Sequence, residues 1–186
     1  HIKKEAENFY SLPEWKTLYP NYDVATKGTP VPFVPYTINS LGANKYSNSD
    51  FNTLFGVEAW SSTLTHTVSL DNSNVLDGSS LKFTTSQTAG APNYLLLPIG
   101  NILNTKKYIL RFSVKGSSNL VKATVNLRKH QANYIRLSSP KTFSITSNHV
   151  DYEMLLEPTV DEADALIQFT LYGGTGTVYF DNVTLF

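Results

Sequence analysis

Apolar and polar residues alternate through most of the chain after residue 50, in short runs separated by turn residues. The run LTHTVSL (64–70) stops at DNSN, and APNYLLLPIGN (91–101) closes on a glycine and an asparagine. An alternation of period two is typical of half-buried β-strands, and Gly, Asn, Asp and Pro tend to end such strands. The pattern predicts strands within 64–70, 79–86, 91–101, 106–116, 120–130, 133–139, 151–158, 165–174 and 177–186.

The spacing of these runs predicts the fold class. Strands follow one another at intervals of roughly 8–15 residues, and no stretch between them has a convincing helical pattern. We therefore expect an all-β fold, an antiparallel β-sandwich of the jelly-roll type, over residues 46–186. The acidic stretch DEADA (161–165) is expected to form a loop or a single turn.

The alternation also separates a core face from a second face on each strand, because successive side chains point to opposite sides. The expected core positions are apolar: Tyr108, Leu110, Phe112, Val114, Val121, Ala123, Val125, Leu127, Ile135, Leu137, Ala165, Ile167, Phe169 and Leu171. The residues between them are polar or aromatic, and the notable ones are Arg111, Asn126, Arg128, Tyr134, Arg136, Gln168 and Tyr172.

These seven residues form a candidate ligand-binding face. Planar amide and guanidinium groups bind pairs of adjacent hydroxyls, and an aromatic ring covers the apolar C–H face of a sugar. Tyr134 is the expected stacking platform. Three alternatives remain open: an ordinary solvated face, a set divided between two sheets, and a sugar site at the loop edge near Trp60 and Tyr94.

Residues 1–45 differ in character from the rest. The stretch GTPVPFVPY (28–36) spaces three prolines too closely for a central strand and favours polyproline II, whereas KKEAENFYSL (3–12) could form one short helix. The segment is also richer in aromatic residues than a solvated linker would be. We expect an aromatic and proline-rich N-terminal extension packed on the sandwich, with an interdomain linker as the alternative.

Composition and charge add four observations. Lys+Arg and Asp+Glu balance at 15 each, so no net charge favours nucleic acid or an anionic membrane. No apolar run approaches the ~20 residues that span a bilayer, so no membrane insertion is expected. The absence of cysteine excludes disulfides and thiolate metal sites. The low charged fraction, 16%, and the abundance of Tyr, Asn, Ser and Thr suit a neutral, hydroxyl-rich ligand.

The sequence predicts no catalytic residues. In DYEMLLE, Asp151, Glu153 and Glu157 share one face of a strand, which suggests a glycosidase carboxyl pair. Retaining glycosidases hold these carboxyls about 5–5.5 Å apart, whereas residues two apart on a strand are separated by ~7 Å. An acidic solvated face explains the pattern, and no serine-nucleophile, phosphate-loop or dinucleotide motif is present.

The closing run TVYFDNVTLF (177–186) contains an interruption. Val178, Phe180 and Val183 continue the apolar alternation, but Asp181 and Asn182 lie between them. The interruption predicts either a bulge turned to water or a carboxylate held in place for a function.

Four stretches resemble jelly-roll carbohydrate-binding modules of families four, nine and twenty-two. NSDFNTLFGVEAW (48–60) is similar to their opening segment, and LDGSSLKFTT (76–85) and LNTKKYILRFSVKGSS (103–118) are similar to two later strands. GTGTVYFDNVTLF (174–186) is similar to their closing strand. The resemblance covers about residues 46–186 and implies a jelly roll that binds carbohydrate.

The resemblance also implies a structural Ca²⁺ ion, which in these modules is often bound by the Asp of the closing strand. Here that residue is Asp181. The family usually has Glu at the position of Asn52, so this chain has one charge fewer there, and Asp50 or Asp77 could replace it. Ca²⁺ prefers six to eight hard oxygen ligands and can join both ends of a domain.

The function expected from these observations is that of a non-catalytic, secreted or cell-surface carbohydrate-binding module. It would be a monomer that binds a polysaccharide or oligosaccharide and targets an attached polysaccharide-degrading enzyme to it. Because Met154 is the one methionine, we expect the chain to be a piece of a longer protein. The alternative is an adhesion or spacer β-sandwich of a surface protein or fibre that binds no sugar.

Overall fold

The computed structural model of the protein describes residues 2–4, 8–10, 42–61, 66–76, 78–86, 92–116, 122–130, 135–172 and 174–186. The chain divides into two compact units, His1–Ser40 and Leu41–Phe186. In the first unit, β1 (Ile2–Lys4) and β2 (Asn8–Tyr10) pair antiparallel, so the expected helix within 3–12 is wrong. The proline-rich stretch, and with it the expected packing of the extension, lies outside the described residues.

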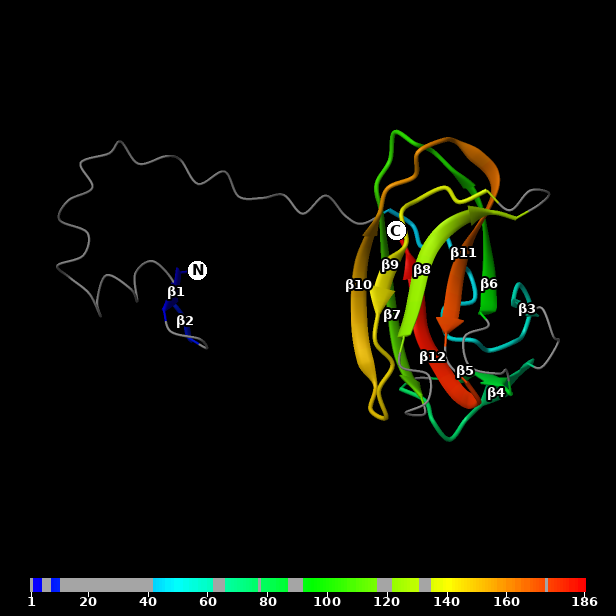
Figure 1. Cartoon of the computed structure of the whole chain (residues 1–186). Coiled ribbons are helices and arrows are strands. Elements are labelled where there is room, and N and C mark those ends of the chain that lie inside the picture. The colour runs from blue at the N-terminus through cyan, green and yellow to red at the C-terminus, as the bar shows by residue number, and fades with distance from the viewer. Residues whose placement is uncertain are drawn as a thin grey trace, which may run out of the picture. The chain divides into compact units, whose positions relative to one another are not determined.

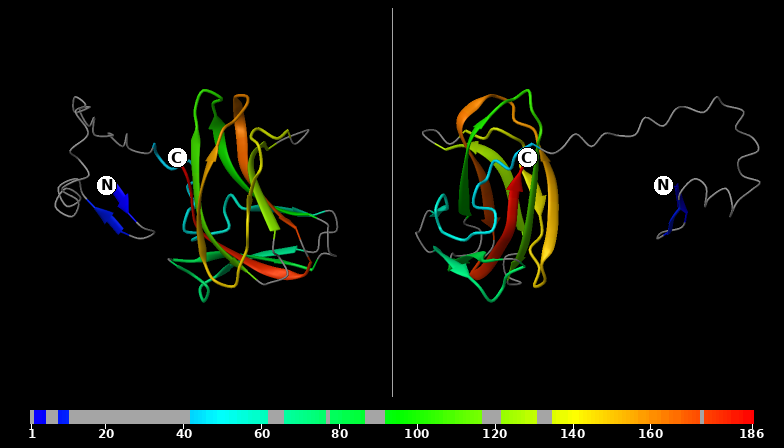
Figure 2. Two further views of the ribbon diagram at one scale, coloured as in Figure 1. Left: turned by 60° about the vertical axis from the view of Figure 1, so that its left-hand side comes forward. Right: turned by 180° about the vertical axis from the view of Figure 1, so that it is seen from behind.

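The second unit is a sandwich of two antiparallel five-stranded sheets (Figures 1 and 2). One sheet has the order β10-β7-β12-β5-β4, formed by Val150–Leu156, Tyr108–Gly116, Gly176–Leu185, Ser80–Thr85 and His66–Asp71. The other has the order β3-β6-β11-β8-β9, formed by Glu58–Ser61, Asn93–Ile102, Glu162–Tyr172, Lys122–Lys129 and Lys141–Phe143. The all-β sandwich expected from the alternation is confirmed. No helix of the described residues is long and apolar enough to cross a membrane.

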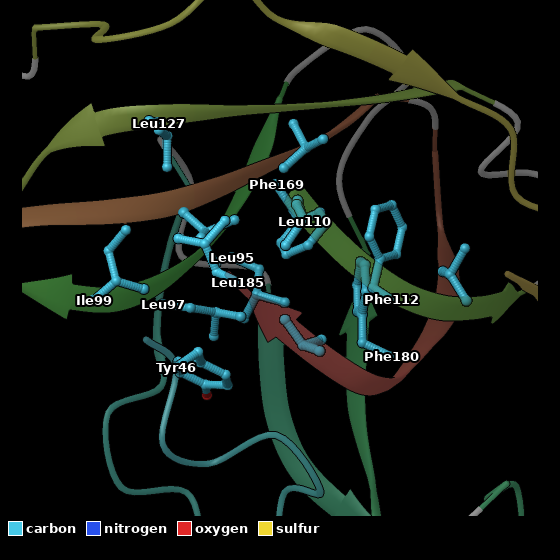
Figure 3. Packing of buried hydrophobic residues seen from close by; sticks show 14 of the residues in the cluster. Tyr46, Leu95, Leu97, Ile99, Leu110, Phe112, Leu127, Phe169, Phe180 and Leu185 are labelled. Atoms are coloured by element: carbon cyan, nitrogen blue, oxygen red, sulfur yellow. The ribbon is translucent and has the colours of Figure 1, made fainter. Parts of the chain in front are cut away.

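The core lies between the two sheets and contains the apolar residues that the alternation selected, with the exceptions of Ile135 and Val121 described below (Figure 3). Phe112 of β7 and Phe169 of β11 meet edge to face with ring centroids 5.0 Å apart, and Phe169 lies 4.7 Å from Phe180 of β12. These three rings join the sheets, since β7 and β12 belong to one and β11 to the other. Aromatic pairs at such distances add to the free energy gained by burial alone.

Three details of the sequence prediction are wrong. Ile135, expected in the core, is 51% exposed, because the described part of 133–139 makes only an isolated bridge from Arg136 to Arg128. Residues 162–165 are not a loop but the start of β11, where Glu162 pairs with Ile102 of β6 and Ala165 pairs with both β6 and β8, which the charge pattern does not indicate. The short strands β3 and β9 were not expected. The predicted core residue Val121 lies outside the described residues.

An irregular segment before β3 closes one edge of the core. Tyr46 and Phe51 are buried, and the backbone around them is fastened to the last strand. The Lys45 N–H donates to the Leu185 carbonyl at 2.7 Å, and the Val183 N–H donates to the Ser49 carbonyl at 3.2 Å. The start and the end of the sandwich are therefore tied together.

A bulge interrupts β12 at the Asp-Asn pair. The pairing with β7 shifts register between Asp181 and Thr184, and Asn182 has a left-handed backbone with φ 51°. The bulge expected from the sequence is therefore present, but its acidic side chain does not face water. Asp181 is fully buried, and its Oδ2 accepts a hydrogen bond from the Leu76 N–H at 2.7 Å.

Candidate functional site

The outer face of the sheet β3-β6-β11-β8-β9 carries rows of side chains that the strand register places side by side. One row runs from Trp60 of β3 through Tyr94 and Thr170 to Thr124 of β8. The next row runs from Glu58 through Leu96 and Gln168 to Asn126. Because side chains alternate across each strand, these residues face away from the aromatic core.

Two adjoining hollows lie on this face, with volumes of about 440 Å³ and 200 Å³. Tyr94 and Arg128 line both hollows, so the two lie side by side, and together they are called the groove below. The residues that line the groove are Glu58, Ala59, Trp60, Tyr94, Leu96, Asn126, Arg128, His130, Arg136, Gln168, Thr170 and Tyr172.

Two aromatic side chains line part of the larger hollow, Trp60 and Tyr94. Trp60 is 50% exposed, and its ring lies 5.4 Å from the Tyr94 ring at an angle of 36°. The Arg128 guanidinium lies 6.0 Å from the centre of the same tyrosine ring. A half-exposed tryptophan beside a second ring and a cation offers an apolar surface with a polar margin, which suits a ligand that has both.

A hydrogen-bonded network forms the floor of the smaller hollow. Gln168 and Asn126 are only 5% and 1% exposed. The Gln168 Nε2 donates to Thr170 Oγ1 at 3.0 Å and more weakly to Asn126 Oδ1 at 3.5 Å, while its Oε1 accepts from Arg128 Nη1. Since these polar groups hold one another in place, the groove presents fixed donors and acceptors without first reordering long side chains.

His130 lies between two carboxylates at one end of the groove. Its Nε2 lies 3.0 Å from Glu58 Oε1, and its Nδ1 lies 3.1 Å from Asp164 Oδ1. Burial disfavours the charged ring, but the hydrogen bonds and charges of Glu58 and Asp164 outweigh this effect and raise the pKa of His130 above 6.5. The Glu58–His130 pair joins β3 to the residue that follows β8, across the two intervening strands β6 and β11.

The structure divides the seven predicted binding residues. Five of them line the groove together, namely Asn126, Arg128, Arg136, Gln168 and Tyr172. Arg111 lies on the outer face of the opposite sheet, where its Nε pairs with Glu153 Oε2 at 2.7 Å beside a separate hollow of about 610 Å³. Tyr134 lies outside the described residues, so the stacking role expected of it stays a prediction.

The groove also contains residues that the analysis of strand faces did not select. Trp60 and Tyr94 were named only as an alternative site, yet they share one groove with the polar set. Glu58 and His130 were not named as binding residues. Glu58 and Trp60 are two residues apart, which could have indicated that both point to the same side of β3. Only the pairing of β3 with β6 shows that this side continues the outer face of the sheet.

The structure describes two of the three residues expected to bind calcium, Asp181 and Asp50. The two carboxylate oxygens of Asp181 accept the N–H groups of Leu76 and Asn182, and a Cβ at Gly78 would lie 3.5 Å from the Asp50 carbonyl oxygen. No group of three or more His, Cys, Asp or Glu side chains suited to a metal occurs in the part of the chain that the structure describes, from which Asp77 is missing. Calcium binding therefore stays a prediction.

The fold is similar to that of several solved structures. An arabinose-bound GH51 α-L-arabinofuranosidase matches 78% of this chain at 19% identity with a TM-score of 0.66, but this chain spans only 26% of that enzyme's length. A CBM4 structure matches 73% of this chain at 18% identity with a TM-score of 0.57, and the match covers 97% of the CBM4 chain. The module TmCBM61, in complex with β-1,4-galactotriose, matches 77% of this chain at 15% identity with a TM-score of 0.55, and the match covers 97% of the TmCBM61 chain.

Neither a protein-family model nor a curated protein matches the sequence. At identities below one fifth, the similarity to solved structures concerns the fold. Residues 41–186 thus have the jelly-roll β-sandwich fold of carbohydrate-binding modules.

Proposed function

We propose that the groove binds a polysaccharide or oligosaccharide and that the protein is a non-catalytic carbohydrate-binding module. The observation that carries this proposal is the half-exposed Trp60 beside Tyr94, in one groove with the buried Gln168–Asn126 network. A sugar has an apolar C–H face that packs on an aromatic ring and hydroxyls that pair with amide and guanidinium groups.

The proposal extends to targeting. The fold occurs as a part of a longer arabinofuranosidase, of which this chain spans 26%, and as complete modules such as the galactotriose complex. A sandwich that binds glycan would raise the effective concentration of an attached enzyme at its substrate. We propose that the protein acts in this way as a monomeric unit, secreted or at the cell surface.

Affinity electrophoresis on a panel of soluble polysaccharides, run beside a reducing-sugar assay, tests the proposal. We expect retardation by at least one glycan and no release of reducing ends. Retardation by none would favour the adhesion or spacer role, and new reducing ends would indicate a glycosidase.

A variant pair locates the site. Trp60→Ala should weaken binding of the retarding glycan by about 2 kcal/mol, roughly 30-fold, from lost stacking and lost apolar burial. Tyr179→Ala is the matched control, because Tyr179 is a partly buried aromatic of β12 in the opposite sheet and lies under Lys115. An equal loss of glycan affinity in both variants, or no loss in either, would contradict the assignment of the groove as the binding site.

A further inference from the structure

Arg128 and Arg136 lie directly opposite each other across an antiparallel bridge. The Lys129 N–H donates to the Ile135 carbonyl at 2.9 Å, and the Leu137 N–H donates to the Leu127 carbonyl at 2.8 Å. These bonds flank the two arginines, which makes them a non-hydrogen-bonded pair, the closer of the two antiparallel types with Cα atoms about 4.5 Å apart. Their side chains leave the backbone on the same face, and both line the smaller hollow.

Two like charges in such a pair repel each other, and the other residues that line the smaller hollow carry no charge. They are Tyr94, Asn126, Gln168, Thr170 and Tyr172. The chain has three arginines, and Arg111, which lies outside this hollow, pairs with Glu153. Among the described residues, none forms an ion pair or a hydrogen bond with the exposed Arg136 side chain.

Three carboxylates on the strands of this sheet have other partners. Glu58 and Asp164 hold His130, and Glu162 pairs with Lys129 at 3.2 Å. Arg128 is itself held in position by Gln168 and by the Tyr94 ring. A positioned guanidinium with a second one beside it is an arrangement that binds carboxylate or sulfate oxygens, often two at a time.

We propose that the smaller hollow binds an acidic group carried on a glycan, so that the ligand of the groove is an anionic polysaccharide. The inference rests on the proposed sugar-binding function and names its substrate class. The acidic group lies between Arg128 and Arg136, and a neighbouring unit of the chain packs on Trp60 and Tyr94. Arg128 lines both hollows and joins the two parts of the site.

Matched pairs of glycans test the charge directly. Affinity electrophoresis is run with polygalacturonate and alginate, with the same polymers after reduction of their carboxyl groups to alcohols, and with a sulfated galactan before and after desulfation. We expect at least one acidic form to bind 10-fold or more tightly than its neutral counterpart, and added salt to weaken that binding. The pair that shows the difference tells whether the recognised group is carboxylate or sulfate.

Two arginine variants locate the charge effect. Arg136→Gln should weaken binding of the acidic form about 10-fold and leave its neutral counterpart unaffected. Arg111→Gln is the control on the opposite sheet and should change neither. Because Arg136 is exposed, its variant should melt as the parent does.

The other outcomes are distinct. Equal binding of acidic and neutral forms, or binding of neutral glycans alone, would overturn the acidic ligand and leave sugar binding intact. Binding of no glycan in either form would overturn both. Weakening by Arg111→Gln but not by Arg136→Gln would place the charge recognition on the wrong sheet and overturn the inference.

Discussion

Replacing Asp181 by alanine should destabilise the sandwich far more than other substitutions of acidic residues. The carboxylate is fully buried in the bulge of β12, and its Oδ2 accepts the Leu76 N–H at 2.7 Å. Its Oδ1 accepts the N–H of Asn182 at 2.8 Å. Leu76 precedes β5, so this side chain joins the loop before one strand to the bulge of its neighbour, 105 positions along the chain.

The expected size follows from these two bonds. A hydrogen bond to a charged group contributes about 1.5–3 kcal/mol, and a buried N–H left without an acceptor keeps its desolvation cost. Asp181→Ala removes both acceptors, so the free energy of unfolding should fall by about 4 kcal/mol. For a domain of this size 1 kcal/mol corresponds to about 2–4 °C, which predicts a Tm lower by about 12 °C. Asp181→Asn keeps one acceptor and should lose about half as much.

Thermal unfolding followed by circular dichroism, with a chelator present, measures the effect apart from any calcium. Asp50→Ala is the matched control, because Asp50 is exposed and, among the described residues, its side chain accepts a hydrogen bond only from the Ser49 hydroxyl. Its Tm should change by no more than about 2 °C. If Asp181→Ala melts as Asp50→Ala does, the bond from Leu76 to the bulge does not hold the sheet together, and the reasoning fails.

Two further predictions concern calcium and pH. If the site around Asp181 binds Ca²⁺, calcium at 100 times its dissociation constant should stabilise the parent protein by roughly 2.7 kcal/mol and leave the stability of Asp181→Ala unchanged. An equal Tm of the parent with calcium and with chelator would exclude calcium binding. Because Glu58 and Asp164 raise the pKa of His130 above 6.5, its ion pairs should contribute fully to stability below about pH 6.5, the unfolded pKa, and be lost as pH rises through the folded pKa. The stability difference between the parent and His130→Gln, measured by urea unfolding, should therefore shrink from pH 6 to pH 8.5, and a constant difference would contradict this.

The strand faces were predictable because they are local. A residue's side in a strand depends only on its parity, so alternation was enough to place Leu110 and Phe169 in the core and to turn Asn126 and Gln168 outward. The bulge at Asp181 was predictable for the same reason, since an acidic pair breaks a local pattern. Ile135 shows the limit of this argument: its run alternates, but its described part forms only an isolated bridge.

Which faces combine into a site was decided by the tertiary structure alone. Alternation placed Arg111 and Arg128 alike on the non-core side of their strands. Because β7 and β8 belong to different sheets, however, the two arginines face opposite sides of the sandwich. Trp60 meets Tyr94 only because β3 joins the edge of β6 in one particular register. A strand's own residues show that one of its faces is apolar and must be buried, but many other strands could pair with it and bury that face equally well. The choice among them depends on loop lengths, on register and on the packing of the whole core, which no local stretch of sequence contains.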